Sequence, residues 1–207
     1  MILHKQKDIG KYSIKYFQNI INVIQNIKID KIAYLSKLLE NSRKKNKNIY
    51  VIGNGGSAVN ASAMANDLGF DILKKTKKKP FRIISLTDNN AISSAISNDV
   101  GFENLFISQI QSIYKSGDLL IVLSVSGNSK NIIKAAKWFR GKRGKVFGIL
   151  GFGGGKLKKI CNESIIIKSK KGEYGPVEDI SKENLCFHKV ADEWIEAYIS
   201  FLFFKIV

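Results

Sequence analysis

Short apolar segments rich in β-branched residues alternate with helix-length stretches through most of this chain, and that alternation restricts its fold more than any other feature. The expected strands cover residues 49–52, 81–86, 119–123, 146–150 and 164–167. The expected helices between them cover residues 57–68, 102–114 and 128–139. Because the strand segments are apolar throughout, helices should cover both faces of the sheet. The sequence therefore predicts an α/β sandwich of three layers around a mainly parallel sheet.

Further helices are expected before and after the sheet. Residues 8–46 are predicted to be helical with one break, since Ile14, Phe17 and Ile21 recur at three- and four-residue spacing. A last helix carries an apolar stripe too wide for a surface helix, and that stripe includes Val190, Trp194 and Tyr198. These faces favour burial between subunits, with a deep intrachain core as the alternative. We expect a single domain over residues 1–207, with 8–46 as a helical extension that packs at a subunit interface.

Composition narrows the class of protein. The chain has 207 residues, of which 44% are apolar, so it is long enough to bury a full core. No charge-free run of 18 apolar residues is present, and the first residues do not form a secretory signal. Cys161 and Cys186 stand in no metal-binding or redox spacing, which favours reduced thiols. We therefore expect a cytoplasmic protein without a membrane span.

The net charge of +17 raises the question of nucleic-acid binding. Lysine runs occur at residues 74–79 and 168–171, but aromatic residues are not interleaved with them as a base-stacking surface requires. Nucleic acid is therefore not the expected partner. A positive field that attracts anionic sugar phosphates is the simpler consequence.

Two loops of small, hydroxyl-rich residues carry the chemistry, and each follows an expected strand. The first is Gly53-Asn54-Gly55-Gly56-Ser57, and the second is Ser124-Val125-Ser126-Gly127-Asn128-Ser129. Each loop opens an expected helix, so backbone N–H groups and the positive helix end face the ligand. A helix cap accounts for one serine of the second loop but not for three. The pair of loops suits a ligand with a phosphate and several hydroxyls, such as a phosphorylated sugar.

Two other phosphate motifs fit less well. The stretch from Gly53 to Ala58 matches G-x-G-x-x-A, the pattern of a dinucleotide site, but the acidic residue expected about 20 positions further on is missing. The stretch from Gly151 to Lys156 imitates a P-loop, although Leu157 replaces the Ser or Thr that would bind magnesium. The second stretch is better explained as a flexible turn between a strand and a helix.

Together the two loops, with Asn98-Asp99 between them, resemble the SIS (sugar isomerase) domain family, and most closely its phosphoheptose isomerase subgroup. The resemblance implies a five-stranded parallel sheet flanked by helices and a homotetramer whose active sites are shared between subunits. It implies an aldose–ketose isomerase that converts sedoheptulose 7-phosphate for lipopolysaccharide or surface-glycan heptose synthesis. The implied phosphate ligands are Ser57, Ser124, Ser126 and Ser129. The implied sugar contacts are Asn54, Gly55, Gly56, Asn98, Asp99 and Val125.

The resemblance also suggests catalytic residues, because moving a proton between adjacent carbons requires a base and an acid. Asp67 aligns with the family acid on the helix after the first loop and is the expected base. His188, on the last helix, is its expected acid partner, and Glu178 or Asp179 is a candidate replacement base. Zinc is allowed by the resemblance, but Ala63 and Ser181 replace two of the family's ligand positions.

Other functions stay open at this point. The same fold could bind a sugar phosphate or a protein partner as a sensor or scaffold, with its chemistry lost. It could also isomerise a different sugar phosphate. A dinucleotide-dependent oxidoreductase is a more distant alternative.

Overall fold

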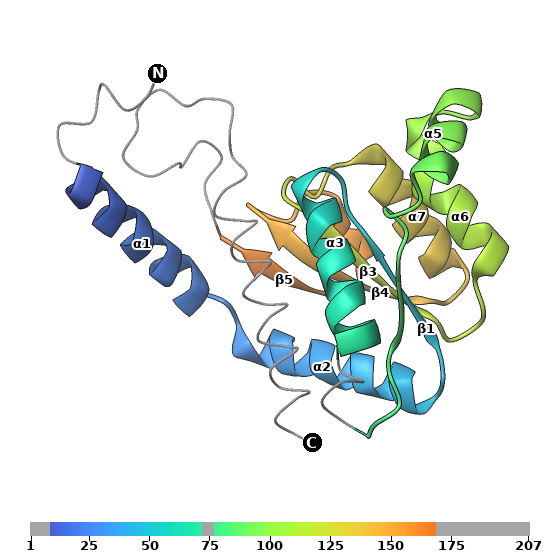
Figure 1. The fold of residues 1–207 in the computed structure, drawn as a ribbon, viewed down its shortest axis with the longest axis horizontal. Coiled ribbons are helices and arrows are strands. Elements are labelled where there is room, and N and C mark those ends of the chain that lie inside the picture. Colours follow the sequence, from blue (N-terminus) through green and yellow to red (C-terminus); the bar gives the residue numbers. More distant parts are fainter. Residues whose placement is uncertain (1–8, 72–76, 169–207) are drawn as a thin grey trace.

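A single parallel sheet forms the centre of the computed structural model, which describes residues 9–71 and 77–168 (Figure 1). Its five strands lie in the order β2-β1-β3-β4-β5, and every neighbouring pair is parallel. The strands are β1 (Asn48–Ile52), β2 (Arg82–Ser85), β3 (Leu119–Ser124), β4 (Lys145–Gly151) and β5 (Glu163–Ile167). The sheet is therefore wholly parallel, where the sequence predicted a mainly parallel one.

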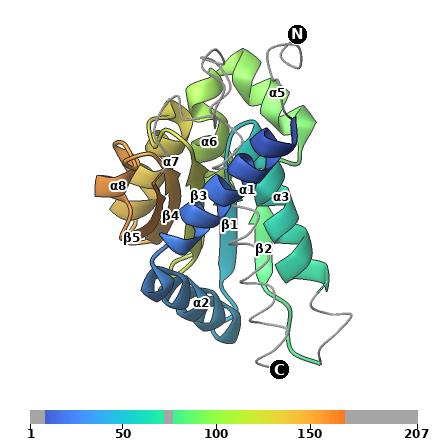
Figure 2. The same ribbon diagram turned by 90° about the vertical axis from the view of Figure 1, so that its left-hand side faces the viewer.

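Helices cover both faces of this sheet: α2 and α3 pack on the core of one face, and α6, α7 and α8 on the core of the other, and Figure 2 looks onto the sheet from the side of α2. The first layer contains α2 (Ile29–Lys44) and α3 (Gly56–Asn66), and a π-helical turn (Asp67–Asp71) extends α3. The second layer contains α6 (Leu105–Ile113), α7 (Lys130–Gly141) and the short α8 (Leu157–Ile160). Helix α5 (Asn90–Asp99) and a 3-10 turn (Phe102–Asn104) precede α6. Helix α1 (Ile9–Gln25) extends away from the sandwich (Figure 1).

Alternation along the buried strands produces two hydrophobic cores, one on each face. In β1, Ile49 and Val51 join the core beneath α2 and α3, whereas Tyr50 and Ile52 join the core beneath α6 and α7. Every residue of β1 and β3 is buried. The three-layer architecture predicted from the apolar strands is confirmed, because two-sided burial is what continuous apolar segments require.

The topology brings the two hydroxyl-rich loops together. Strand β1 lies between β2 and β3, so the chain leaves β1 toward one side and later returns to pair with it on the other. Ile52 and Val122, near the ends of β1 and β3, are register partners. In parallel α/β sheets, ligands bind at such a reversal of strand order, outside the carboxyl ends of the strands.

Several expectations can be compared with this fold. The predicted helical segment at 8–46 consists of α1 and α2, separated by residues 26–28. Helix α5 was not predicted, and α8 is the helix implied after the turn at 151–156, although no bounds were predicted for it. The apolar helix expected around Trp194 lies outside the described residues. No helix in the described part of the chain is long and apolar enough to span a membrane.

Candidate functional site

A cavity of about 190 Å³ lies at the carboxyl ends of β1 and β3. Its lining contains all four serines expected to bind phosphate, together with two of the expected sugar contacts. The lining residues are Asn54, Ser57, Leu123, Ser124, Val125, Ser126, Ser129 and Ile132. No charged side chain is among them, so an anion bound there would be held by hydroxyl, amide and main-chain donors.

Hydrogen bonds within the second loop orient two of its hydroxyls. Ser124 Oγ accepts the N–H of Gly127 at 3.1 Å, and Ser126 Oγ accepts the N–H of Asn128 at 3.2 Å. A hydroxyl oxygen that accepts an N–H still has its own proton to donate. Ser124 and Ser126 are therefore positioned as donors to a phosphate oxygen.

Ser129 contributes in a different way, since it is the N-cap residue of α7. Its side chain makes no capping hydrogen bond, so the Ser129 hydroxyl is available to a ligand. The twelve-residue helix α7 begins at this point and directs its positive end toward the cavity. The loop thus combines three hydroxyls with a helix N-terminus.

Glycines determine the shape of the first loop beside the cavity. Gly55 has φ 55° and is the N-cap of α3, and a Cβ added at this position would have no heavy atom within 4 Å. At Gly53 a Cβ would lie 2.5 Å from the carbonyl oxygen of Ser57, so the backbone turns too tightly for any side chain there. This turn places the buried Ser57 at the start of α3, beside the second loop.

Asn131, which sequence reasoning did not identify, ties the two loops together. Its amide nitrogen donates to Asn54 Oδ1 at 2.9 Å, and Asn54 Nδ2 donates back to Asn131 Oδ1 at 3.0 Å. Asn131 is only 2% exposed and its Oδ1 also accepts the N–H of Ile132. A polar residue two positions after the phosphate loop, at a buried helical position, was the available signal.

The glycine-rich turn between β4 and α8 supports the second loop through backbone hydrogen bonds. The N–H of Leu157 donates to the carbonyl of Gly127 at 3.0 Å, and the N–H of Lys156 donates to Asn128 Oδ1 at 3.1 Å. A Cβ on Gly127 would overlap the carbonyl of Gly154. The stretch that imitates a P-loop is thus a turn, as predicted, and it also supports the neighbouring loop.

Other predicted sugar contacts lie elsewhere. Asn98 and Asp99 are exposed at the end of α5, where Asn98 Nδ2 donates to Asp99 Oδ1 at 2.8 Å. Neither residue lines the cavity. Gly55 and Gly56 belong to the first loop but are not among the lining residues either.

The predicted base also lies away from the phosphate loop. Asp67 follows α3, whose eleven residues span roughly 16 Å at about 1.5 Å per residue. It is half-buried, and its Oδ1 accepts a hydrogen bond from Asn66 Nδ2 at 3.0 Å. His188, Glu178, Asp179 and Ser181 lie outside the described residues.

A second carboxylate, Asp88, lies at the carboxyl end of β2. Its Oδ1 accepts hydrogen bonds from the hydroxyls of Ser85 at 3.0 Å and Thr87 at 3.1 Å, and from Ser62 on α3. Three hydroxyls therefore fix one oxygen of this carboxylate at the same edge of the sheet as the cavity.

The described residues do not fit the family's zinc set. Ala63 has no donor atom, so the two family positions on this stretch of chain provide one ligand, Asp67. Within residues 9–71 and 77–168, no group of three or more His, Cys, Asp or Glu side chains could hold a metal ion. Zinc prefers a closed or nearly closed set of such ligands.

A parallel α/β fold with a hydroxyl-lined cavity at its reversal point is an arrangement suited to a phosphorylated ligand. Residues 14–151 match the SIS domain, and the chain belongs to that family, which confirms the resemblance found in the sequence. It is 40% identical over 138 residues to a phosphoheptose isomerase of Leptospira biflexa, covering 67% of this chain and 71% of the relative. It is 32% identical over 155 residues to that of Campylobacter concisus, covering 75% and 78%.

Solved structures share the same fold. A phosphoheptose isomerase from Francisella tularensis superposes with a TM-score of 0.77 and 23% identity, over 95% of this chain and 98% of that one. One from Neisseria gonorrhoeae gives the same TM-score at 20% identity and the same coverage. These comparisons confirm the SIS architecture predicted from the sequence.

Proposed function

We propose that this protein is a phosphosugar aldose–ketose isomerase whose substrate is sedoheptulose 7-phosphate. The observation that carries the proposal is the cavity at the ends of β1 and β3, where four serines and the start of α7 converge. Relatives that are 32% and 40% identical are named phosphoheptose isomerases, which supports this choice of substrate.

The separation between the cavity and Asp67 suits a long substrate. With the phosphate held by Ser124, Ser126 and Ser129, a seven-carbon chain would extend along α3 toward the far end of that helix. The carbonyl end of such a ketose is the end most remote from its phosphate. The role proposed for Asp67 is therefore chemistry at the carbonyl end rather than phosphate binding.

The proposed reaction is a proton transfer through an enediol. Asp67 removes the proton from the carbon beside the carbonyl while His188 protonates the carbonyl oxygen, which gives the enediol. Asp67 then returns its proton to the former carbonyl carbon, and the hydroxyl on the neighbouring carbon returns a proton to His188 as the aldehyde forms. Main-chain donors stabilise the oxyanion as it develops. Asp88, whose Oδ1 is fixed by three hydroxyls, is the carboxylate to compare with Asp67, because it lies at the same edge of the sheet.

We also propose that this chain forms a homo-oligomer, because its resemblance to the phosphoheptose isomerase subgroup implies a homotetramer. Helix α5 has no buried residue, and Ile92 and Phe102 are 42% and 54% exposed. On α1, Ile14 and Phe17 are 59% and 61% exposed on the helix that extends from the sandwich. Exposed apolar clusters of this kind mark interaction surfaces. Contacts made by α5 with a second copy would also bring Asn98 and Asp99 toward a shared site.

The proposed setting is the cytoplasm, in heptose synthesis for lipopolysaccharide or another surface glycan. A free, buried thiol at Cys161 fits a reducing compartment. Burial raises the pKa of this thiol to about 12, which keeps it protonated and unreactive.

The experiment is deuterium exchange in heavy water, with sedoheptulose 7-phosphate and shorter ketose phosphates followed by NMR. We expect deuterium at the carbon beside the carbonyl of sedoheptulose 7-phosphate. Asp67→Asn should slow exchange at least about 100-fold without changing sugar-phosphate affinity, since a positioned base contributes about that factor. Asp30→Asn, an exposed carboxylate on α2, is the matched control.

Three results would redirect the proposal. Full exchange by Asp67→Asn, together with its loss in Asp88→Asn, would move the base to Asp88. Exchange of another sugar alone would keep the reaction and change the substrate. Binding without any exchange would show a sensor or scaffold instead of an enzyme.

A further inference from the structure

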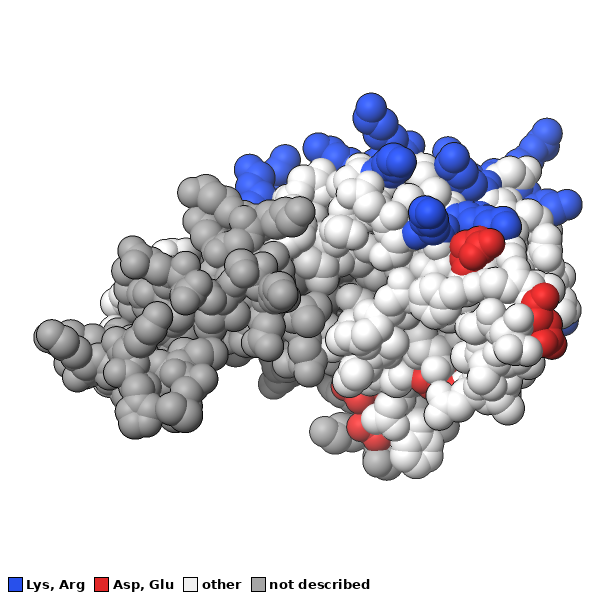
Figure 3. All heavy atoms as spheres, turned by 90° about the horizontal axis from the view of Figure 1, so that it is seen from above, with Lys and Arg blue, Asp and Glu red and all other residues white. Residues whose placement is uncertain are grey.

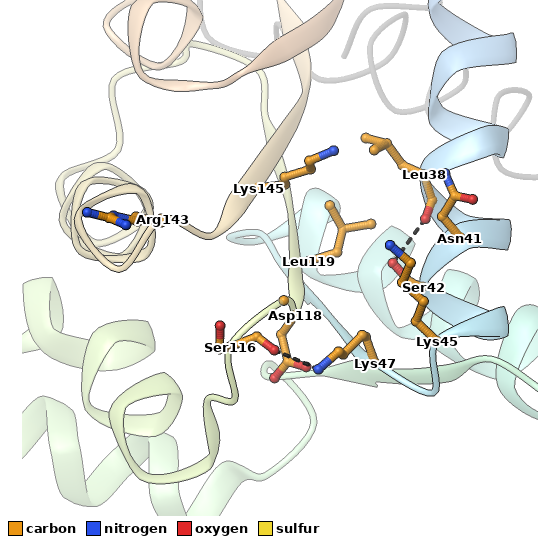
Figure 4. A pocket seen from close by; sticks show the side chains of 11 residues that line it. Leu38, Asn41, Ser42, Lys45, Lys47, Ser116, Asp118, Leu119, Arg143 and Lys145 are labelled. Atoms are coloured by element: carbon orange, nitrogen blue, oxygen red, sulfur yellow. Dashed lines mark hydrogen bonds between the residues drawn. The ribbon is translucent and has the colours of Figure 1, made fainter.

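A second concave site lies at the opposite end of the sheet, at the amino ends of β1, β3 and β4. Figure 4 shows this pocket between the last turns of α2 and the start of β3. Its volume is about 330 Å³, within the range of about 300–1,000 Å³ typical of small-molecule sites. Leu119 lies at its base, and it is one end of the same strand that carries Ser124 at the other. Six residues at about 3.3 Å each place the two ends of β3 roughly 17 Å apart.

Four cationic residues line this pocket, two from each of two segments of the chain. Lys45 and Lys47 follow α2, Arg143 follows α7, and Lys145 is the first residue of β4. In Figure 4 the Arg143 side chain lies apart from the other three and points away from Leu119. In Figure 4, Lys45 and Lys145 extend toward the space beside Leu119 from opposite sides, and Lys47 turns toward Ser116. Lys47 Nζ donates to the Ser116 carbonyl at 2.7 Å.

The charge of this cluster is not balanced by acidic side chains of the described chain. Within the described residues, none of the four cations forms an ion pair. The ion pairs found there are made by Lys31, Arg43 and Lys44. The pocket contains one carboxylate, Asp118, which is 2% exposed and bonded inward. It accepts the N–H of Asn48 and the hydroxyl of Tyr50, each at 2.9 Å. Asp118 therefore holds the strands together rather than pairing with the lysines.

A structural explanation accounts for part of this cluster. Cations are favourable near helix C-termini, and Lys45 and Arg143 follow the ends of α2 and α7. That effect acts within a helix's last turn and does not explain Lys47, which precedes β1, or Lys145, which is the first residue of β4. Nor does it explain a concave surface shared by three elements.

The surrounding chain adds to the positive field. Between Asp118 and Glu163 the sequence has ten lysines and arginines and no aspartate or glutamate. Figure 3 looks onto the loop end of the sheet, and there the Lys and Arg side chains gather along the margin where α7 and α8 lie. The positive charge therefore extends beyond the pocket to the loop end of the sheet, and it would attract anions to this side of the molecule in general.

We propose that this amino-edge pocket, formed around Lys45, Lys47, Arg143 and Lys145, binds a small molecule that carries two or more phosphate groups. Several cations spread across a pocket of this size match several phosphates, whereas the serine cavity offers one compact set of neutral donors for one. The site is separate from the proposed isomerase site, so either proposal can fail without the other.

The test measures binding of inorganic tripolyphosphate by calorimetry and maps it by NMR. We expect binding that weakens with added salt and shifts the amide of Gly117, which lines the pocket, but not that of Gly127 in the serine loop. The double variant K45Q/K145Q should weaken binding by about tenfold or more, equivalent to about 1.4 kcal/mol. Sedoheptulose 7-phosphate should not displace the probe.

The matched control is K137Q/K158Q, which removes the same charge from exposed positions of α7 and α8 outside the pocket. Its affinity should stay within about twofold of the wild type, an energy difference of about 0.4 kcal/mol. An equal loss in both variants would overturn the proposal, because it would show diffuse attraction to the whole positive layer, as expected for a nucleic acid. Shifts confined to Gly127 would also overturn it, since they would place the probe in the serine cavity.

Discussion

The two ends of β3 carry two concave sites that differ in how they would hold an anion. At the carboxyl end, the cavity around Ser124 is lined without any charged side chain. At the amino end, the pocket around Leu119 is lined by four cations from separate elements. In the serine cavity, backbone N–H groups fix the hydroxyls of Ser124 and Ser126 by hydrogen bonds. In the amino-end pocket, the donors are long side chains with rotamer freedom.

The difference indicates what each site can select. Fixed hydroxyl and N–H donors require a phosphate in one position and lose little to salt, because they act at short range. Mobile ammonium groups accept several anion shapes, and their attraction is screened within about 10 Å at 0.1 M salt. The carboxyl-end site is therefore suited to positioning a substrate for chemistry, and the amino-end site is suited to binding a multiply charged anion.

The largest expected effect comes from Gly127→Ala, which would disrupt the carboxyl-end site alone. Gly127 has φ 63°, and a Cβ there would overlap the carbonyl of Gly154. Left-handed strain and the forced movement of that backbone should cost about 3 kcal/mol of unfolding free energy. Sugar-phosphate affinity, measured by calorimetry, should fall about 100-fold. Gly153→Ala, with open space around its Cβ, should change neither quantity.

Asp118→Asn is the corresponding change at the amino end. Asp118 accepts the N–H groups of Asn48 and Lys115 and the hydroxyl of Tyr50. Replacing this buried carboxylate should cost about 2–3 kcal/mol, because hydrogen bonds to a charged group are lost and an amide donor is buried. Urea unfolding measures the cost, with the exposed Glu103→Gln as control. A change below about 0.5 kcal/mol would show that the network is not a structural support.

Asn131→Ala should give an intermediate effect, by separating the two loops of the serine cavity. The buried amide of Asn131 exchanges two hydrogen bonds with Asn54, so its loss leaves Asn54 without that partner. We expect a cost of about 1–2 kcal/mol in unfolding free energy. The KM for the sugar phosphate should rise while tripolyphosphate binding stays constant. Lys130→Ala, exposed on the same turn, is the control, and equal KM values for the two variants would argue against the coupling.

The smallest effect is expected from Glu40→Gln on α2, which tests whether charge pairs near the amino end contribute stability by themselves. Hydrogen bonds from Arg43, at 2.7 and 2.8 Å, lower the pKa of Glu40. Because the pKa is depressed in the folded state, the stabilisation is present above the unfolded value near 4.5 and fades as pH falls. The substitution should cost about 0.5 kcal/mol at pH 7. The difference from the wild type, measured by unfolding at a series of pH values, should shrink as pH falls below 4.5, and a difference that does not change with pH would indicate a packing effect.

The parts of the fold with strong local patterns were predictable from the sequence. The five apolar segments became the five strands, because strands buried on both faces consist mostly of apolar residues, and in β1 and β3 the polar Asn48 and Ser124 stand only at an end. Helix α5 was not predicted, although Ile92 and Ile96 stand four positions apart, because its short stretch is otherwise rich in Ser and Asn and none of its residues is buried. Its start has a local signal nevertheless, as Asn89 accepts the N–H of Ile92 in an N-cap.

The candidate site was predictable only where its residues are contiguous in sequence. Ser124, Ser126 and Ser129 stand within six positions, so their chemistry is evident before the fold is known. Asn131 acts through its contact with Asn54, which is 77 positions away, and Gly154 acts through its contact with Gly127, which is 27 positions away. Such contacts exist only once the sheet has formed, and composition or spacing does not reveal them.

The support that the turn after β4 gives to the serine loop has a consequence for how the protein forms during synthesis. The N–H of Leu157 bonds to Gly127, while the opposite wall of the cavity comes from Asn54. During synthesis, both hydroxyl-rich loops are therefore made well before the turn that supports the second loop. Parallel pairing across such long separations is slow to form. A ligand present during synthesis would stabilise the chain only after residue 157 has left the ribosome, because binding stabilises only the assembled state.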